Sequence, residues 1–159
     1  MTTDQSLRAD WIAIGVGAVA LALILGALGY QYLGGLPPCP MCHWQRWPHI
    51  AAAFIGLIGG GFLPRRYALY VAAAAIALVA VSGLIGAYHT GMEWKIFPGP
   101  TTCTGPRFQL GSSIDVPIVR CDVAIPVFLG QSLAFFNAVI SLGVAAIAGI
   151  LLKKATRAA

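Results

Sequence analysis

The chain of 159 residues is strongly apolar and sparsely charged, with 58% hydrophobic residues, 9% charged residues and a mean hydropathy of +0.81. Soluble domains carry about 25% charged residues, and a water-exposed fold of this size could not bury so much apolar surface. The net charge of +5 is scattered and forms no basic face with interleaved aromatic residues, which argues against a nucleic-acid partner. The composition therefore predicts an integral membrane protein.

Four apolar stretches approach the roughly 20 residues that a helix needs to cross a bilayer. In chain order they are residues 11–32, 44–62, 67–88 and 125–152. Each run is continuous rather than alternating, which favours helices over a transmembrane β-barrel. We therefore predict an all-α integral membrane protein, a single domain over residues 1–159 built as a four-transmembrane-helix bundle.

Basic residues flank the predicted spans in a pattern that indicates orientation. They are Arg8, Arg65, Arg66, Lys153, Lys154 and Arg157. Because Lys and Arg accumulate beside membrane spans on the cytoplasmic side, both termini are predicted to be cytoplasmic. The connections 33–43 and 89–124 then lie on the outer, periplasmic side, together with all the cysteines.

The four cysteines form two pairs of different kinds. Cys39 and Cys42 make a CxxC at the start of the second span, whereas Cys103 and Cys121 lie in the long outer loop. A CxxC bridge closes too small a loop to stabilise the fold much, so this pair is better suited to redox chemistry. The long loop is rich in Pro and Gly, so we expect a Cys103–Cys121 bridge to be mobile and accessible for thiol–disulfide exchange.

Polar residues follow the CxxC at helical spacing. If a helix begins at Cys42, Arg46 lies at i+4 and His49 at i+7 on the same face. The charge of Arg46 would lower the pKa of the Cys42 thiol and could bind a reducible carbonyl. Snorkelling of Arg46 and an ordinary buried hydrogen bond for His49 are the structural alternatives. His89 and Glu93 carry the same ambiguity.

Three other interpretations use the same cysteines. Residues 39–43 also spell CxxCH, the c-type haem attachment motif with His43 as axial ligand, but haem leaves Cys103 and Cys121 unexplained. A zinc site is disfavoured where an oxidant keeps thiols paired, so no metal is predicted. Two purely structural disulfides are the third alternative.

The run from Cys39 to His49, CPMCHWQRWPH, resembles the signature of the disulfide bond formation protein B (DsbB) family, and the resemblance covers most of the chain. Further matching segments are 88–91, 97–100, 121–122 and 128–130. The resemblance implies a thiol–disulfide oxidoreductase of the bacterial inner membrane. Such a protein re-oxidises a periplasmic DsbA-like thioredoxin-fold oxidase and delivers the electrons to ubiquinone or menaquinone.

The resemblance also implies a role for each cysteine. Cys103 would exchange with the partner, with Cys121 as its mate. Cys39 would exchange with the loop pair, and Cys42 would face the quinone beside Arg46. The predicted catalytic residues are therefore the four cysteines, and the predicted quinone site contains Cys42, Arg46 and His49.

Overall fold

The computed structural model describes residues 3–104 and 119–157. Its long helices are α1 (Thr3–Tyr32), α2 (Pro40–Phe54), α4 (Ala68–Glu93) and α6 (Leu133–Arg157). The shorter elements are the π-helix η1 (Ile55–Gly59), α3 (Gly60–Phe62), the 3-10 helix η2 (Arg65–Tyr67), α5 (Thr101–Thr104), β1 (Pro126–Phe128) and β2 (Gln131–Ser132).

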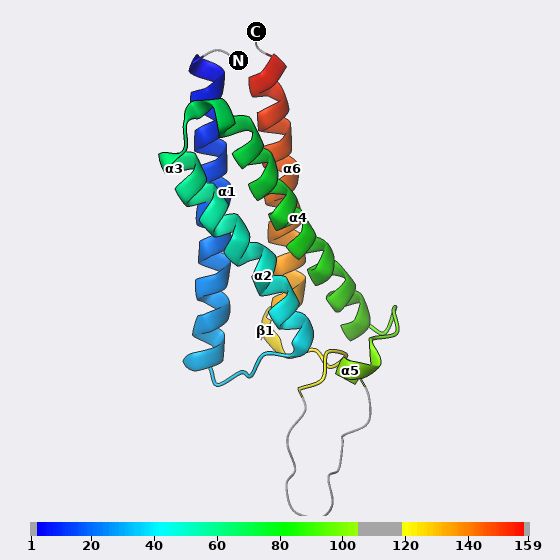
Figure 1. Cartoon of the computed structure of the whole chain (residues 1–159). Helices are drawn as coiled ribbons and strands as arrows, with labels where there is room; N and C mark the ends of the chain where they lie inside the picture. Colours follow the sequence, from blue (N-terminus) through cyan, green and yellow to red (C-terminus); the bar gives the residue numbers. More distant parts are fainter. Residues whose placement is uncertain (1–2, 105–118, 158–159) are drawn as a thin grey trace, which may run out of the picture.

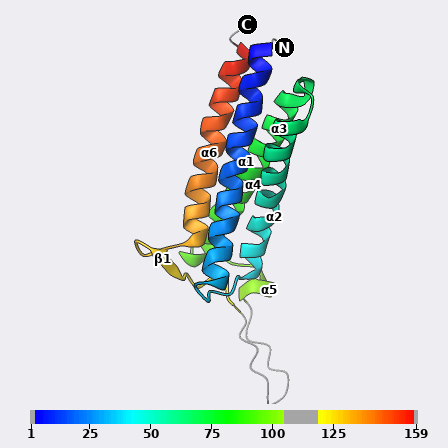
Figure 2. The same ribbon diagram turned by 90° about the vertical axis from the view of Figure 1, so that its left-hand side faces the viewer.

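Four helical arms lie side by side along one long axis: α1, α4, α6 and the run formed by α2, η1 and α3 (Figure 1). Both ends of the chain lie at one end of this bundle. The start of α2, α5 and the β1–β2 hairpin lie at the opposite end, as the view turned by 90° also shows (Figure 2). The cysteines are therefore gathered at the end of the bundle remote from both termini.

Three helices in the described part of the chain are long and apolar enough to cross a membrane: residues 4–32, 65–93 and 133–157. The apolar stretch 44–62 is also helical, but it is divided among α2, η1 and α3, so no single helix there has the required length. The protein thus has membrane-spanning helices. A fourth span over residues 44–62 stays a prediction.

Helical structure extends beyond two of the predicted spans. Helix α1 already begins at Thr3, and α4 continues to Glu93. His89 and Glu93, which were expected in the outer loop, therefore belong to the last turns of α4. Of the rest of that loop, 105–118 lies outside the described residues.

The sequence-based prediction starts the fourth span at residue 125, which is too early. Residues 126–132 form an antiparallel hairpin instead of helix, and α6 starts at Leu133. The turn contains Leu129 at φ +47° and Gly130 at φ +75°, a left-handed conformation that a right-handed helix cannot include. The apolar run from Ile125 therefore contains a strand, a tight turn and then a helix.

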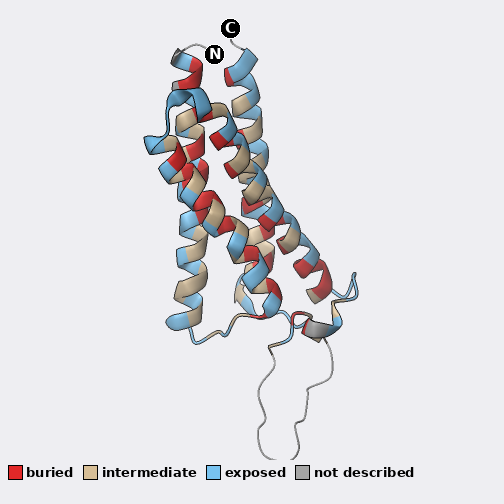
Figure 3. Ribbon diagram, viewed as in Figure 1, coloured by how far each residue is buried: buried red, intermediate tan, exposed pale blue. Residues whose placement is uncertain are grey.

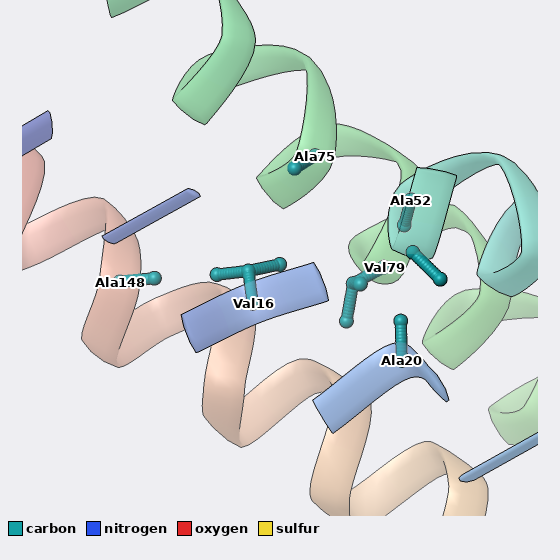
Figure 4. Close-up of a cluster of buried hydrophobic side chains, with 7 residues drawn as sticks. Val16, Ala20, Ala52, Ala75, Val79 and Ala148 are labelled. Atoms are coloured by element: carbon teal, nitrogen blue, oxygen red, sulfur yellow. The ribbon is translucent and has the colours of Figure 1, made fainter. Parts of the chain in front are cut away.

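Small side chains form the centre of the bundle. One cluster is contributed by all four arms (Figure 4), and its labelled members are Val16, Ala20, Ala52, Ala75, Val79 and Ala148. Large apolar side chains such as Trp11, Phe54 and Leu84 point outward and are exposed, and Figure 3 shows the same inside–outside division along the helices. This arrangement suits a lipid solvent, in which small residues let helices approach and bulky apolar residues face the hydrocarbon.

Backbone contact between α1 and η1 depends on two glycines. A Cβ built on Gly56 would lie 2.8 Å from Gly17 Cα, and a Cβ on Gly17 would lie 2.9 Å from Leu57 N. The π-helical turn η1 occurs at this contact. Gly56 is therefore required by the close approach of two main chains.

Replacing Gly56 with alanine is expected to lower the midpoint of thermal unfolding, because the new methyl group meets main-chain atoms that cannot move aside. Overpacking of this kind costs about 1–3 kcal/mol. Gly149→Ala is the matched control, since a Cβ there meets nothing within 4 Å. That variant should keep or raise the midpoint. Equal midpoints for the two variants in detergent solution would contradict the proposed contact.

Candidate functional site

The CxxC pair begins helix α2. Cys39 is the N-cap, Pro40 occupies the first helical position, where its missing N–H costs nothing, and Cys39 Sγ accepts a hydrogen bond from Cys42 N at 3.2 Å. Both cysteines are free thiols, and their sulfurs lie 2.8 Å apart. Cys39 is buried, whereas Cys42 is partly exposed. The two thiols thus have different surroundings although they share one helical turn.

The loop pair forms a disulfide between Cys103 of α5 and Cys121, with Cα atoms 5.4 Å apart. Cys121 N also donates to Cys103 O at 3.1 Å. The sequence-based expectation of an accessible bridge is wrong here, because the two cysteines are only 1% and 0% exposed. Met41 and Met92 pack against them in one buried cluster. Access to Cys103 therefore requires this cluster to open.

The two cysteine pairs meet at helix α4. The sulfurs of Cys39 and Cys121 and Nε2 of His89 all lie within 4.8 Å of one another, and Cys39 Sγ is 3.7 Å from His89 Nε2. These three atoms have the spacing of a metal site, but zinc binds cysteine as a thiolate. Because Cys121 is bonded to Cys103, it has no thiolate to offer. The same closeness is what thiol–disulfide exchange between the two cysteine pairs requires.

An exposed ionic cluster holds the chain beside Cys121. Arg120 binds both carboxylate oxygens of Asp122, at 2.9 and 2.8 Å, and Lys95 Nζ lies 3.0 Å from Asp122 Oδ2. These hydrogen bonds, from Arg120 first and Lys95 second, hold the pKa of Asp122 well below its usual range. Lys95 lies two residues beyond the end of α4, so the cluster ties the returning chain to the end of that helix.

Glu93 links α4 to the hairpin in the same region. Ser132 Oγ of β2 donates to Glu93 Oε2 at 2.5 Å, and Glu93 Oε1 lies 3.8 Å from His89 Nε2. The side chains of His89 and Glu93 are 3% and 5% exposed. His89 is therefore enclosed by a carboxylate and by the sulfurs of both pairs.

A cavity of about 380 Å³ opens beside the CxxC pair and is lined from α1, α2, α4, α6 and the hairpin. This volume falls within the range of small-molecule sites, about 300–1,000 Å³. Its lining is largely apolar, and its polar contributions from α2 are Cys42, Gln45, Arg46 and His49. The predicted grouping of Cys42, Arg46 and His49 is thus present as a shared cavity wall.

Arg46 reaches across the cavity wall to α1. Its Nη1 donates to Gln31 Oε1 at 2.6 Å, and its Nη2 donates to Ala27 O at 3.4 Å. The hydrogen bond with Cys39 lowers the pKa of the Cys42 thiol, and the Arg46 guanidinium acts in the same direction. The same hydrogen bond between Cys39 and Cys42, together with burial, raises the pKa of the Cys39 thiol. Cys42 is consequently the more acidic thiol of the pair.

Sequence reasoning missed four hydrogen-bonded polar residues of this region: Gln45 and Asn137, which line the cavity, and Ser82 and Ser141. His49 Nε2 lies 2.8 Å from Asn137 Oδ1, so His49 joins this group. One signal could have found it, since Asn137 is the only asparagine of the chain and interrupts an apolar stretch. Polar residues inside predicted spans are costly and usually functional.

Comparison with known proteins agrees with this geometry. The family model for disulfide bond formation protein DsbB matches residues 9–151. The chain belongs to the DsbB family. It is 32% identical over 137 residues to disulfide bond formation protein B of Aromatoleum aromaticum, covering 79% of this chain and 81% of that protein. It is 30% identical over 146 residues to the protein of the same name from an Azoarcus species, covering 84% and 86%.

A third relative, disulfide bond formation protein B of Alkalilimnicola ehrlichii, is 39% identical over 82 residues, which cover 52% of this chain and 50% of that protein. No solved structure gives a significant match. Membership of the DsbB family makes the chain a membrane disulfide bond formation protein. The alternative of a c-type haem protein built on His43 receives no support.

Arg46→Gln is expected to raise the pKa of the Cys42 thiol, because the variant removes a cation that favours the thiolate. Alkylation of Cys42 in the reduced protein, followed by peptide mass spectrometry across pH, should therefore shift its midpoint to higher pH. Arg46→Lys keeps the charge and should shift it less. A midpoint that does not move in Arg46→Gln would remove Arg46 from the electrostatics of Cys42.

Proposed function

We propose that this DsbB-family protein re-oxidises a periplasmic DsbA-like thioredoxin-fold thiol oxidase and passes the electrons through its two cysteine pairs to a membrane quinone. The acceptor would be ubiquinone or menaquinone. The observation that supports this most strongly is the position of Cys39, whose sulfur lies 2.8 Å from Cys42 Sγ and within 4.8 Å of Cys121 Sγ. The Cys39 sulfur can therefore bond with Cys42 and can also exchange with the loop disulfide.

The first exchange takes place at the loop pair. A thiolate of the reduced partner attacks Cys103 Sγ, the Cys103–Cys121 bond breaks, and Cys121 leaves as a thiolate. The second thiol of the partner then displaces Cys103, so the partner leaves with a disulfide and the loop pair keeps two electrons. Because both loop cysteines are buried, docking of the partner must displace the cluster that covers Cys103.

The second exchange transfers the electrons to the CxxC pair when that pair is oxidised. The Cys121 thiolate attacks Cys39 Sγ, and Cys42 leaves, since the thiol of lower pKa is the better leaving group. Cys103 then attacks Cys121, which restores the loop disulfide and releases Cys39. The described state, with a bonded loop pair and free Cys39 and Cys42, corresponds to the product of this step.

The cavity beside Cys42 fits a quinone head group. Its apolar lining suits a lipid-soluble ring, Arg46 provides a fixed cation for a carbonyl oxygen, and one nitrogen of His49, Nδ1, is buried without a hydrogen-bond partner among the described residues. When bound, a quinone supplies an acceptor for two electrons and two protons. We assign Cys42, Arg46 and His49 to its site.

We further propose four membrane spans, with α2, η1 and α3 together forming the second. This run lies alongside α1 and α4 (Figure 1), and its second part, from Ile50 to Phe62, is entirely apolar. Both termini would lie in the cytoplasm and the cysteines at the periplasmic face of the bacterial inner membrane. The supporting facts are the basic residues beside the spans and the placement of the cysteines at the opposite end of the bundle.

Anaerobic mixing of the purified protein with a reduced thioredoxin-fold CxxC donor and a short-chain ubiquinone tests both ends of this pathway. One quinone should be reduced for each donor dithiol oxidised, which is followed by the loss of quinone absorbance and by thiol titration of the donor. Cys42→Ser should abolish quinone reduction. The control Arg65→Gln, at the opposite end of the bundle, should leave it unchanged. Donor oxidation without quinone reduction would refute the proposal.

A further inference from the structure

A continuous chain of hydrogen bonds runs from the cysteines into the bundle. Gln45 Nε2 lies 2.8 Å from His89 Nδ1, Asn137 Nδ2 lies 2.7 Å from Gln45 Oε1, and His49 Nε2 lies 2.8 Å from Asn137 Oδ1. His89 contacts Cys39 at one end of this chain, His49 forms the other end, and both histidines line the cavity. Two side-chain amides therefore connect two histidines.

Backbone carbonyls fix the orientation of both amides. Gln45 Nε2 donates to Met41 O at 3.2 Å, and Asn137 Nδ2 donates to Ser82 O at 3.2 Å. A carbonyl oxygen only accepts hydrogen bonds, so the amide atom that faces it must be the NH₂ group. The remaining amide oxygens, Gln45 Oε1 and Asn137 Oδ1, are then acceptors.

These orientations determine which nitrogen of each neutral histidine carries the hydrogen. His49 Nε2 faces the acceptor Asn137 Oδ1, so Nε2 must be the N–H of His49. His89 Nδ1 faces the donor Gln45 Nε2, so His89 accepts there and directs its Nε2–H towards Cys39 Sγ, 3.7 Å away. The amide pair thus holds both imidazoles in the Nε2–H tautomer.

The other ring nitrogen of His49, Nδ1, takes no part in this chain of hydrogen bonds. His49 is 4% exposed, and its Nδ1 is a buried polar atom without a hydrogen-bond partner among the described residues. In the Nε2–H tautomer this nitrogen has a lone pair and no hydrogen. A buried unsatisfied acceptor is costly, which points to a missing donor or proton at this place.

We propose that His49 Nδ1 is the proton-exchange atom of the quinone cavity, and that Gln45 and Asn137 are positioning residues that keep it available. The inference rests on the function proposed above and adds the route of one proton. The two sulfurs lie 2.8 Å apart, so a single hydrogen, on the less acidic Cys39, joins them when Cys42 is ionised. The reduced pair therefore lacks one of the two protons that quinol formation consumes.

His49 supplies that second proton. The proton that Cys42 loses on ionising is taken up at His49 Nδ1, which gives an imidazolium that still donates from Nε2 to Asn137. As Cys39 and Cys42 join in a disulfide, two electrons pass to the quinone. One proton comes from Cys39 and one from His49 Nδ1. His49 returns to its neutral Nε2–H tautomer, and no amide has to turn.

The tautomer can be measured without quinone. In ¹⁵N-histidine-labelled, quinone-free protein in mildly alkaline detergent solution, imidazole nitrogen shifts distinguish a protonated from a bare nitrogen. The resonances of His49 are assigned by their loss in His49→Gln. We expect a bare Nδ1 and a protonated Nε2, and we expect Asn137→Leu to remove this preference. A protonated Nδ1 in the wild-type protein would overturn the inference.

The proton transfer is tested by single-turnover reduction of a short-chain ubiquinone. Glutamine at position 49 can bond to Asn137 but cannot carry a proton, so His49→Gln should slow quinone reduction about 100-fold. Its quinone affinity and its quinone-free exchange with a reduced thioredoxin-fold donor should stay close to wild type. His43→Phe, which removes an exposed histidine of the same helix, is the matched control and should not change the rate.

The outcomes separate the two proposals. If wild-type protein reduces quinone and His49→Gln reduces it equally fast, the role of His49 is refuted while the proposed function stands. If wild-type protein does not reduce quinone, the proposed function fails, whatever the tautomer. If His49→Gln loses exchange with the donor as well, His49 is structural and the inference is refuted.

Discussion

Contact between sulfurs is the constraint on which this site depends, because thiol–disulfide exchange proceeds only when one sulfur reaches another. Cys39 meets this constraint twice, with Cys42 on its own helical turn and with Cys121 from the loop pair. Its place is fixed by its position as the N-cap of α2, and that of Cys121 by the disulfide and by the ionic cluster around Asp122. Helix α4 contributes His89 to the meeting point. Three distant parts of the sequence are thus needed to place two sulfurs.

The apolar solvent explains why the rest of the bundle is built as it is. Polar groups inside a membrane must find partners within the protein, and they are retained where they have a function. Small residues such as Ala52 and Val79 let the helices approach, so the side chains of Gln45 and Asn137 can meet between helices. These amides satisfy each other and nearby carbonyls, yet Nδ1 of His49, a residue that lines the cavity, is buried without a hydrogen-bond partner in the part of the chain that the structure describes. The polar interior therefore runs along the cavity, from His89 beside Cys39 to His49.

The sequence was sufficient for features that depend on local spacing. The CxxC at a helix start and the shared face of Arg46 and His49 follow from helical periodicity, and the structure places these residues on one cavity wall. The hairpin 126–132 could not be predicted, because its apolar residues suit a span and its turn places a leucine in a left-handed conformation. Burial of the loop disulfide and pairing of Gln45 with Asn137 depend on contacts between segments distant in sequence, which hydrophobic periodicity does not encode.

The most direct test of the central contact uses a double variant, Cys42→Ser with Cys103→Ser, which leaves one cysteine from each pair. Mild oxidation of the folded protein in detergent should join Cys39 to Cys121 within one molecule, and peptide mass spectrometry would identify the bridge. The same oxidation in denaturant should lose this preference, because the two cysteines meet only in the folded bundle. Two free, separately alkylated thiols in the folded protein, or bridges only between molecules, would contradict the account.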